Sequence, residues 1–268
     1  IVIKFFKKII NKFLIFLSPL FKILSPLINY LTEINFEKDL FRIQKSKWST
    51  VPGTVYKRID NHDLLKLEDN EFIKKYDEMI KEDNNSYRSI YREKYLLNDS
   101  KKILDLGCGI GRDGIFLAER GYEVTFADVV PSNIHLVERV CNLKNLNCSF
   151  VKLEKMDDYE NLGKFDLIIA MGSLHHMPMK ITKKIIEKMS KNFEKNKTKF
   201  LMLTYPFSRW KKDGCLPFRF WGLKTDGWAP WTEYYDKKKI ALVFSNKLEI
   251  IDELKINDEF IIFYIQIN

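Results

Sequence analysis

Short apolar runs alternate with longer amphipathic segments from Lys101 to Asn268. Runs of that length predict strands, and segments with apolar residues at every third or fourth position predict helices. Strands that alternate with helices predict a parallel sheet with helices on both faces. The predicted strands are residues 102–106, 122–128, 148–153, 165–172 and 198–205, and the predicted helices are residues 112–120, 131–143 and 179–193.

The C-terminal segment, residues 248–267, has two further apolar runs on either side of Asn257 and Asp258. Asparagine and aspartate tolerate the backbone conformations of tight turns, so this segment predicts a hairpin. Such a hairpin would add an antiparallel strand to the sheet.

The part of the chain before Lys101 predicts helices. In residues 71–97, Tyr76, Met79 and Ile80 recur at helical spacing. Residues 36–60 are mixed, and the sequence STVPGT predicts a turn-rich joint. We therefore expect residues 36–100 to form an N-terminal helical cap.

The first 35 residues predict a basic amphipathic helix. Lys4, Lys8 and Lys12 share one side, and residues such as Phe5 and Ile9 fill the other. Five lysines and one glutamate give residues 1–35 a net charge of +4, and their longest uncharged run, about ten residues, is too short to span a bilayer. Two interpretations stay open, a segment on a membrane surface through residues 1–33, or a helix docked on the domain or on a second subunit.

The composition changes this interpretation little. An apolar content of 46% is ordinary for a globular chain, and the formal charge of +9 comes largely from scattered lysines. These lysines predict a solvated helix face, so a nucleic-acid partner is not favoured. The four cysteines form no CxxC pair and no cluster with zinc spacing, which predicts reduced thiols, a cytoplasmic location and no metal.

The first predicted strand leads into the sequence DLGCGIGRDG, from Asp105 to Gly114. Gly109, Gly111 and Gly114 satisfy the GxGxxG pattern, and Asp128 follows at the end of the next strand, as in a dinucleotide site. A pyrophosphate, however, is disfavoured beside an anion. The carboxylate of Asp105 suits a cationic ligand, and S-adenosylmethionine carries a sulfonium and an ammonium but no phosphate. The sequence therefore favours the methyl donor over NAD.

The sequence ILDLGCGIGRDGIFLAERGYEVTFADVVPSNI resembles the first two motifs of the class I S-adenosylmethionine-dependent methyltransferases. The resemblance extends over residues 101–268, with the aromatic insertion at residues 205–235. It implies an α/β fold, a Rossmann-like sheet of seven mostly parallel strands with one antiparallel strand and helices on both faces. The N-terminal helical segments would be an extension of this domain.

The resemblance also implies roles for individual residues. Asp105 would lie near the methionyl amine, and Asp128 would accept both ribose hydroxyls. The position that usually contacts the adenine amine holds Glu154, or else Asp157 fulfils this role. The sequence AMGSLHHMP follows the fourth strand, where many small-molecule methyltransferases have LHHLP. The other cofactor-binding residues implied are Gly107, Gly109, Gly111, Val129, Met156 and Met171.

The acceptor is expected to bind to the insertion at residues 205–235 and to residues that precede the first strand. This insertion holds ten aromatic residues, too many for a disordered loop. Aromatic faces beside charged groups suit a sugar, and they also suit a planar or quinone-like ring. A purely structural lid is the alternative. The candidate acceptor-binding residues are Trp210, Arg219, Trp221, Trp228 and Trp231.

A hydroxyl acceptor needs a general base, for which His175 and His176 are the first candidates, followed by Glu233 and Asp226. The leading hypothesis is O-methylation of a sugar or sugar-linked intermediate in surface-glycan biosynthesis, at the inner face of the membrane. The alternatives are a quinone-like or lipid acceptor, RNA, and an inactive scaffold. Intact Asp105, Asp128 and glycines argue against the scaffold.

Overall fold

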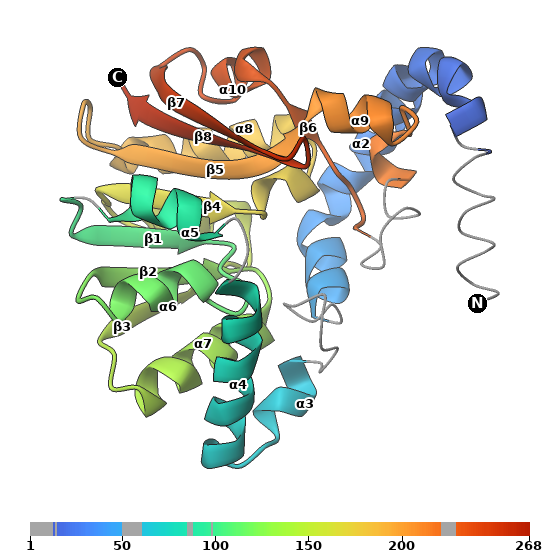
Figure 1. The fold of residues 1–268 in the computed structure, drawn as a ribbon. Helices are drawn as coiled ribbons and strands as arrows, with labels where there is room; N and C mark the ends of the chain where they lie inside the picture. Colours follow the sequence, from blue (N-terminus) through green and yellow to red (C-terminus); the bar gives the residue numbers. More distant parts are fainter. Residues whose placement is uncertain (1–12, 14, 50–60, 85–87, 98, 221–228) are drawn as a thin grey trace.

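The structure is a computed structural model of the chain (Figure 1). It describes residues 13, 15–49, 61–84, 88–97, 99–220 and 229–268. Of the residues that the sequence proposed for the site, Trp221, Asp226 and Trp228 lie outside these ranges.

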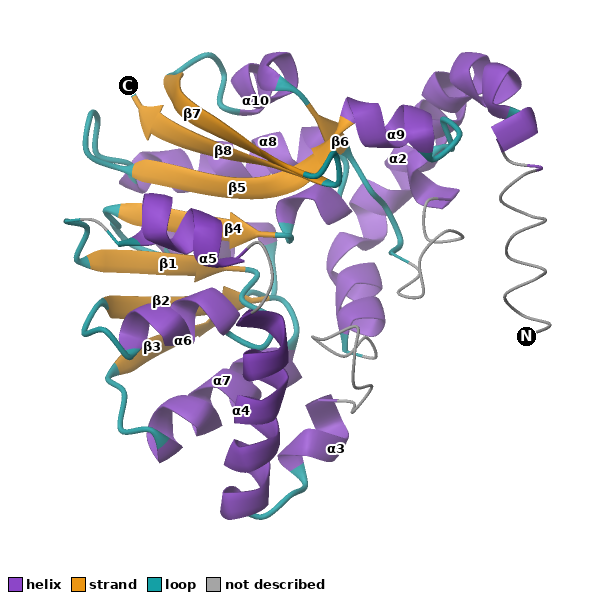
Figure 2. Cartoon of the chain, viewed as in Figure 1, coloured by secondary structure: helices purple, strands orange, loops and turns teal. Residues whose placement is uncertain are grey.

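One twisted sheet forms the centre of the protein, as Figure 2 shows. Its strands follow the order β3-β2-β1-β4-β5-β8-β7, and β6 pairs separately with β5. The strands are β1 (Lys102–Leu106), β2 (Glu123–Asp128), β3 (Cys148–Lys152), β4 (Leu167–Met171), β5 (Lys199–Pro206), β6 (Tyr234–Tyr235), β7 (Leu248–Ile256) and β8 (Phe260–Ile267).

The pairing of the strands confirms the predicted fold class. Strands β1 to β5 pair in parallel, and β8 pairs antiparallel with both β5 and β7. In the seven-stranded path, β8 is thus the one strand that runs against the others. The hairpin between β7 and β8 turns at Asn257 and Asp258, whose φ angles of 48° and 56° are left-handed. The short strand β6 was not predicted.

Helices cover both faces of the sheet (Figure 2). On one face, the core contains residues of β1 and β4 together with α8 and α10; on the other, it contains residues of α4, α6 and α7. The α-helices are α2 (Ser18–Trp48), α3 (Asn61–Leu65), α4 (Asp69–Asn84), α5 (Arg88–Tyr91), α6 (Arg112–Ala118), α7 (Pro131–Leu143), α8 (Met179–Met189), α9 (Phe207–Lys212) and α10 (Lys237–Val243).

Five shorter helical segments complete the fold, and they include the loops at the carboxyl ends of the strands. They are the π-helix η1 (Arg92–Leu96) and the 3-10 helices η2 (Met156–Asn161), η3 (Leu174–His176) and η4 (Ser190–Asn192), together with a single turn at Phe218–Phe220.

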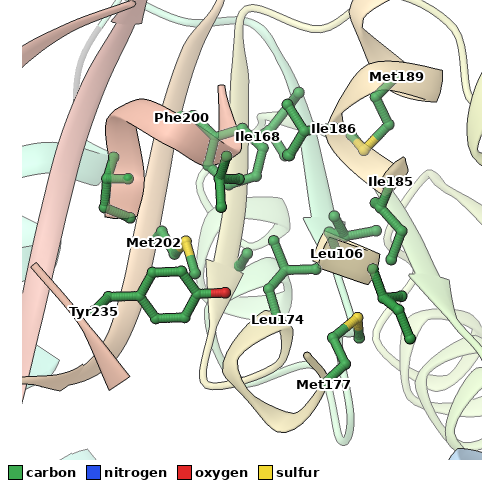
Figure 3. Close-up of a cluster of buried hydrophobic side chains, with 14 of the residues drawn as sticks. Leu106, Ile168, Leu174, Met177, Ile185, Ile186, Met189, Phe200, Met202 and Tyr235 are labelled. Atoms are coloured by element: carbon green, nitrogen blue, oxygen red, sulfur yellow. The ribbon is translucent and has the colours of Figure 1, made fainter. Parts of the chain in front are cut away.

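The helical spacing of its apolar residues explains why α8 packs on the sheet. Ile181, Ile185 and Met189 recur at intervals of four residues and are all buried, whereas the lysines of the helix face outward. Figure 3 shows Ile185 and Met189 among side chains of β4 and β5. Leu174 and Met177, from the loop between β4 and α8, lie beside them. The lysine-rich face predicted from the sequence is thus the solvated side of an amphipathic helix.

The helix predicted over residues 71–97 is divided into α4, α5 and η1. Arg92 is the first residue of the π-helical turn. Its side chain extends toward the glycine loop, where its Nε lies 2.8 Å from Asp113 Oδ1. Wide turns of this kind are often found where a helix presents a side chain for function.

The sequence predicted a helical segment that ends at residue 35, followed by a mixed region, but helix α2 runs unbroken from Ser18 to Trp48 with Pro26 inside it. It lies beyond the carboxyl ends of the parallel strands (Figure 1). Its Ser25 Oγ donates to Cys215 O at 2.6 Å, and its Asn29 Oδ1 accepts from Phe218 N at 2.7 Å. These contacts join the N-terminal extension to the insertion after β5.

The aromatic insertion contributes an internal core beneath α2. Trp231 is fully buried, with ring centroids 5.7 Å from Phe36 and 5.9 Å from Phe218. Trp231 Nε1 donates to Glu233, whose carboxylate also pairs with Lys239. The described part of the insertion therefore uses its aromatics chiefly to fasten α2 to the domain.

No helix in the part of the chain that the structure describes is long and apolar enough to cross a membrane.

Removal of the Phe36 ring should detach α2 from this core. We expect Phe36→Ala to lower the free energy of unfolding by about 3–5 kcal/mol, because a fully buried aromatic side chain is lost. The matched control is Phe16→Ala, which removes an exposed ring from the same end of the chain and should change stability by less than about 0.5 kcal/mol. Urea denaturation measures both, and equal effects would contradict this packing.

Candidate functional site

The glycine loop after β1 turns sharply at the carboxyl end of the sheet. Gly107, Gly109 and Gly111 have φ angles of 70°, 55° and 77°, which residues other than glycine rarely adopt. The nitrogens of Gly107 and Cys108 both donate to the carbonyl of Ala127, at 2.7 and 3.2 Å, so the loop is bound to the end of β2. This geometry exposes backbone to whatever lies above the loop.

Asp105 is buried at the base of this loop. Its Oδ2 accepts a hydrogen bond from Gly114 N at 3.0 Å, at the start of α6. Burial, followed by the nearby carboxylates of Asp113 and Asp128, raises the pKa of Asp105 to about 8, although the hydrogen bond from Gly114 opposes this shift. Near neutral pH this carboxyl group therefore holds its proton until a cation is brought beside it.

Asp128 ends β2 and is held by three donors. Its Oδ2 accepts from Gly109 N at 2.9 Å and from Asn133 Nδ2 at 3.1 Å, and its Oδ1 accepts from Val130 N at 2.8 Å. Burial raises the pKa of Asp128, while the hydrogen bonds oppose this shift. The carboxylate is thus fixed in orientation before any ligand arrives.

The loop after β4 completes this side of the site. Met171 ends the strand, Gly172 has a φ of 89°, and Ser173 Oγ donates to Leu106 O at 2.8 Å. Gly107 must be glycine here, because a Cβ on it would lie 2.4 Å from Ser173 Cβ. The two loops therefore pack directly on each other.

These loops surround a cavity of about 340 Å³ at the carboxyl ends of β1, β2 and β4. Open α/β sheets bind ligands at this edge, where neighbouring loops diverge. Of the cofactor residues proposed from the sequence, Asp105, Gly107, Gly109, Asp128, Val129 and Met171 line the cavity. Gly111 lies behind it, and its φ of 77° marks the turn into α6.

Glu154 and Met156 do not line the cavity. Glu154 is exposed and pairs with Lys152 at 2.8 Å, and Asp157 pairs with Lys188 at 2.8 Å. From this part of the chain, Leu153 and Tyr159 line the cavity instead. The wall beside Val129 is therefore apolar where the sequence led us to expect a carboxylate.

The opposite wall of the cavity comes from helix α2, which lies in the region before the first strand that was expected to bind the acceptor, although no residue of it was named from the sequence. Leu40, Phe41, Gln44 and Trp48 all line the cavity. Gln44 Nε2 donates to His176 O at 2.7 Å, and Trp48 Nε1 donates to Gln44 Oε1. These four residues recur at helical spacing. A helix prediction extended from residue 36 to residue 48 would have placed them on one face.

The two histidines after β4 have different surroundings. His176 lines the cavity, with its ring centroid 4.6 Å from that of Trp48. Its Nδ1 donates to Trp231 O at 3.2 Å, so Nε2 carries the lone pair. Burial lowers the pKa of His176 to about 4, which keeps the ring neutral at physiological pH.

His175 is fully buried and lies outside the cavity. Its Nδ1 lies 3.2 Å from Leu203 O, and its ring packs on Tyr205 with centroids 4.7 Å apart. Burial, and to a smaller extent the neighbouring His176, lowers the pKa of His175 well below its usual value. Of the two histidines, only His176 can reach a ligand.

The other candidates for the base and the acceptor site are placed elsewhere. Glu233 is buried away from the cavity, with its carboxylate bonded to Met179 N, Trp231 and Lys239. Trp210 Nε1 donates to Leu216 O, and Arg219 is exposed outside the cavity. Trp210 and the buried Trp231 pack within the insertion, and none of these four residues lines the cavity.

A buried ionic cluster behind the glycine loop was not identified from the sequence. Asp113 accepts from Arg88 Nη1 at 3.0 Å, from Arg92 Nε at 2.8 Å and from Tyr91 Oη at 2.8 Å. Burial alone would raise the pKa of Asp113, but these partners lower it below the usual value. The cluster fastens α5 and η1 to the loop and places Arg88 in the cavity wall.

In the described ranges, no group of three or more histidine, cysteine, aspartate or glutamate side chains is arranged to hold a metal ion.

Comparison with known proteins agrees with the fold. Residues 103–196 match the protein family described as "Methyltransferase domain". A solved S-adenosylmethionine-dependent methyltransferase from Clostridium acetobutylicum superposes with a TM-score of 0.54 at 15% identity, over 74% of this chain and 98% of that one.

Two curated relatives align with shorter parts of the chain. A 23S rRNA (uracil(747)-C(5))-methyltransferase of Pyrococcus horikoshii is 34% identical over 26% of this chain, and (S)-coclaurine N-methyltransferase of Papaver somniferum is 32% identical over 48%. The alignments span only 17% and 32% of these relatives' own lengths.

The sheet order, the glycine loop and the acid that ends β2 define a Rossmann-like domain for a nucleoside-bearing cofactor. With the family match, this is a class I S-adenosylmethionine-dependent methyltransferase domain, and the chain carries it between β1 and β5. S-adenosylmethionine is the cofactor of this family.

The residues around the cavity fit this cofactor. Asp128 offers carboxylate oxygens to a pair of ribose hydroxyls, and Asp105 suits the ammonium group. Arg88 and Arg112 also line the cavity and suit the methionyl carboxylate. A Cβ built on Gly109 meets nothing within 4 Å, so the backbone at this glycine borders open space.

A methyl group on Gly109 should therefore obstruct the cofactor without disturbing the packing. Gly121 is a matched control, because it also has a left-handed φ, 84°, has no atom within 4 Å of a built Cβ, and lies outside the cavity. We expect Gly109→Ala and Gly121→Ala each to lower stability by about 1–2 kcal/mol. Only Gly109→Ala should weaken S-adenosylhomocysteine binding, by tenfold or more (~1.4 kcal/mol), in calorimetric titration. Equal affinity in both variants would contradict this placement.

The raised pKa of Asp105 should make cofactor binding depend on pH. A bound ammonium favours the ionised carboxylate, so binding below pH 8 releases a proton. The affinity for S-adenosylhomocysteine should rise from pH 6 toward pH 8, by at most about tenfold per pH unit for one proton, and then level off. Calorimetry in two buffers of different ionisation enthalpy measures the released proton. Asp105→Asn should bind more weakly and lose this slope, and an unchanged slope would exclude Asp105 as its source.

Proposed function

We propose that the chain transfers the methyl group of S-adenosylmethionine to an acidic hydroxyl of a flat, largely apolar small molecule. The observation that carries this proposal is the composition of the cavity, in which the cofactor loop faces Leu40, Phe41 and Trp48 of α2 across one continuous space. An aromatic and aliphatic wall favours a planar acceptor such as a quinol-like ring.

S-adenosylmethionine supplies a methyl group already activated by its positive sulfur. The protein therefore contributes mainly by positioning, and its two buried carboxylates and the glycine loop hold the cofactor in one orientation. Helix α2 forms the opposite wall of the same space. The acceptor would lie against Trp48, whose ring is partly buried and packs at a tilt of 46° against His176.

His176 is the proposed general base. Its Nδ1 proton is held by Trp231 O, so Nε2 receives the proton of the acceptor hydroxyl as the oxygen attacks the methyl carbon and the sulfur–carbon bond breaks. The pKa of about 4 makes His176 a weak base. A phenolic hydroxyl, with a pKa of about 10, is a much better partner for such a base than an aliphatic alcohol.

The pKa of the proposed base and the placement of the described tryptophans support a planar acceptor over a sugar. The sugar hypothesis depended on four tryptophans of the insertion, of which Trp221 and Trp228 lie outside the described residues. Of the other two, Trp231 is core and Trp210 is bonded within the insertion. Sugar hydroxyls are also less acidic. By their names, the two curated relatives act on a uracil of RNA and on an alkaloid, so relatedness does not choose the acceptor.

An acceptor screen with the purified chain tests the proposal. We expect S-adenosylhomocysteine to form with catechol- or quinol-type phenols, and not with nucleotide sugars or RNA. Methylation of a sugar nucleotide or of RNA in the absence of phenol methylation would contradict the proposed acceptor class.

Substitution of the two histidines tests the mechanism. His176→Gln should lower kcat/KM by about 10²–10⁴ with S-adenosylhomocysteine affinity retained, because only the proton acceptor is lost. His175→Gln is the neighbouring control, and its rate per cofactor-binding site should stay within a few fold of the wild type. Equal rates for His176→Gln and the wild type would exclude His176 as the base.

A further inference from the structure

The N-terminal half of α2 is oriented opposite to an ordinary surface helix. Its small polar residues face the protein, where Ser25 is fully buried against Cys215 O and Asn29 accepts from Phe218 N. Surface helices usually bury their apolar stripe and expose their polar one. The outer face of this part of the helix, by contrast, is apolar.

Large apolar side chains cover this outer face. In the described part of the chain, nine of the fourteen exposed large hydrophobic residues lie between Phe13 and Leu31. Five of them are aligned opposite Ser25, since at about 100° per residue they project within about 40° of the reverse direction. Their exposed fractions are 78% for Phe16, 50% for Leu20, 76% for Ile23, 58% for Leu27 and 65% for Tyr30.

The alignment extends along most of the exposed half of α2. Leu24 and Leu31 flank these five residues and are themselves exposed. Figure 1 shows this end of α2 extending past α9, away from the sheet. A contiguous exposed apolar face of this length is typical of a surface that binds a membrane or another protein.

The charge of the segment distinguishes between two ways of covering this face. Lys22 is the only charged residue between Phe13 and Thr32, and residues 1–35 carry five lysines against one glutamate. A second copy of the chain would bring the same positive segments together, and the formal charge of the whole chain is +9. An anionic lipid surface instead attracts these lysines and accepts the apolar face.

We infer that the outer face of α2, formed by Leu20, Ile23 and Leu27 with their neighbours and with Phe16 just before the helix, lies in the interface of an anionic lipid bilayer. Leu20 and Leu27 enter the headgroup and acyl boundary, and the axis of the helix lies along the surface. The opposite side of the same helix, through Ser25 and Asn29, stays on the insertion.

This surface deepens the proposed function and, in its consequence for the acceptor, rests on it. Helix α2 ends in Gln44 and Trp48, which line the cavity, so one helix contacts both the lipid surface and the acceptor space. An acceptor with an apolar ring or tail, dissolved in the bilayer, would reach His176 without crossing bulk water. The class of acceptor that follows is an amphiphile with an acidic hydroxyl.

Vesicle co-sedimentation of the full chain tests the docking, and it needs no methyl transfer. We expect the wild type to sediment with vesicles of phosphatidylcholine mixed with phosphatidylglycerol, and more weakly with phosphatidylcholine alone. The double variant Leu20→Glu/Leu27→Glu should bind at least about tenfold more weakly, since two leucines leave the interface. The matched control is Leu242→Glu on α10, an exposed leucine (43%) on another helix, which should bind like the wild type.

S-adenosylhomocysteine titration of each variant shows that the fold and the cofactor site are intact. Normal cofactor binding with lost vesicle binding supports the inference, whatever the acceptor screen shows. Vesicle binding by the double variant at the wild-type level would overturn it. A wild-type dimer in sedimentation velocity that the double variant converts to monomer would also overturn it, because a second copy would then cover this face.

Discussion

The site depends on two carboxylates that the fold places out of water at the ends of neighbouring strands. Asp105 and Asp128 are both buried, and the backbone nitrogens of Gly114, Gly109 and Val130 hold them. Burying carboxylates is unfavourable unless hydrogen bonds or cations compensate, and here each pKa is raised. A ligand that brings an ammonium and two hydroxyl donors relieves this cost, whereas a pyrophosphate increases it.

The second constraint is the packing of α2 over the same edge of the sheet. Phe36 and Trp231 fix the middle of the helix, and Gln44 binds the backbone of His176. The aromatic insertion, the histidine loop and the N-terminal extension are therefore one packed unit, although they are far apart in the sequence. The cavity exists because this unit stands opposite the glycine loop, and its apolar wall limits which acceptors fit.

Most of the fold could be predicted because local patterns determined it. The apolar runs and the glycines identified β1 to β5, and helix α7 was predicted to the residue from Pro131 to Leu143. The residues that line the cavity could be predicted only where a motif carries them, as at Asp105 and Asp128. Trp48 and Leu153 were missed, and Glu154 was expected where Leu153 lies, because which side of a loop faces the cavity depends on long-range packing. The role of Trp231 depends likewise on Phe36, 195 residues earlier in the chain.

The measurement that tests this account most directly is a calorimetric titration of the full chain with S-adenosylhomocysteine, alongside NADH, repeated on Asp128→Ala. The account predicts binding of the thioether with a dissociation constant of about a micromolar, a loss of at least about tenfold (~1.4 kcal/mol) in the variant, and no heat from NADH. Binding of NADH, or thioether binding that Asp128→Ala leaves unchanged, would contradict the assignment of the cavity to S-adenosylmethionine.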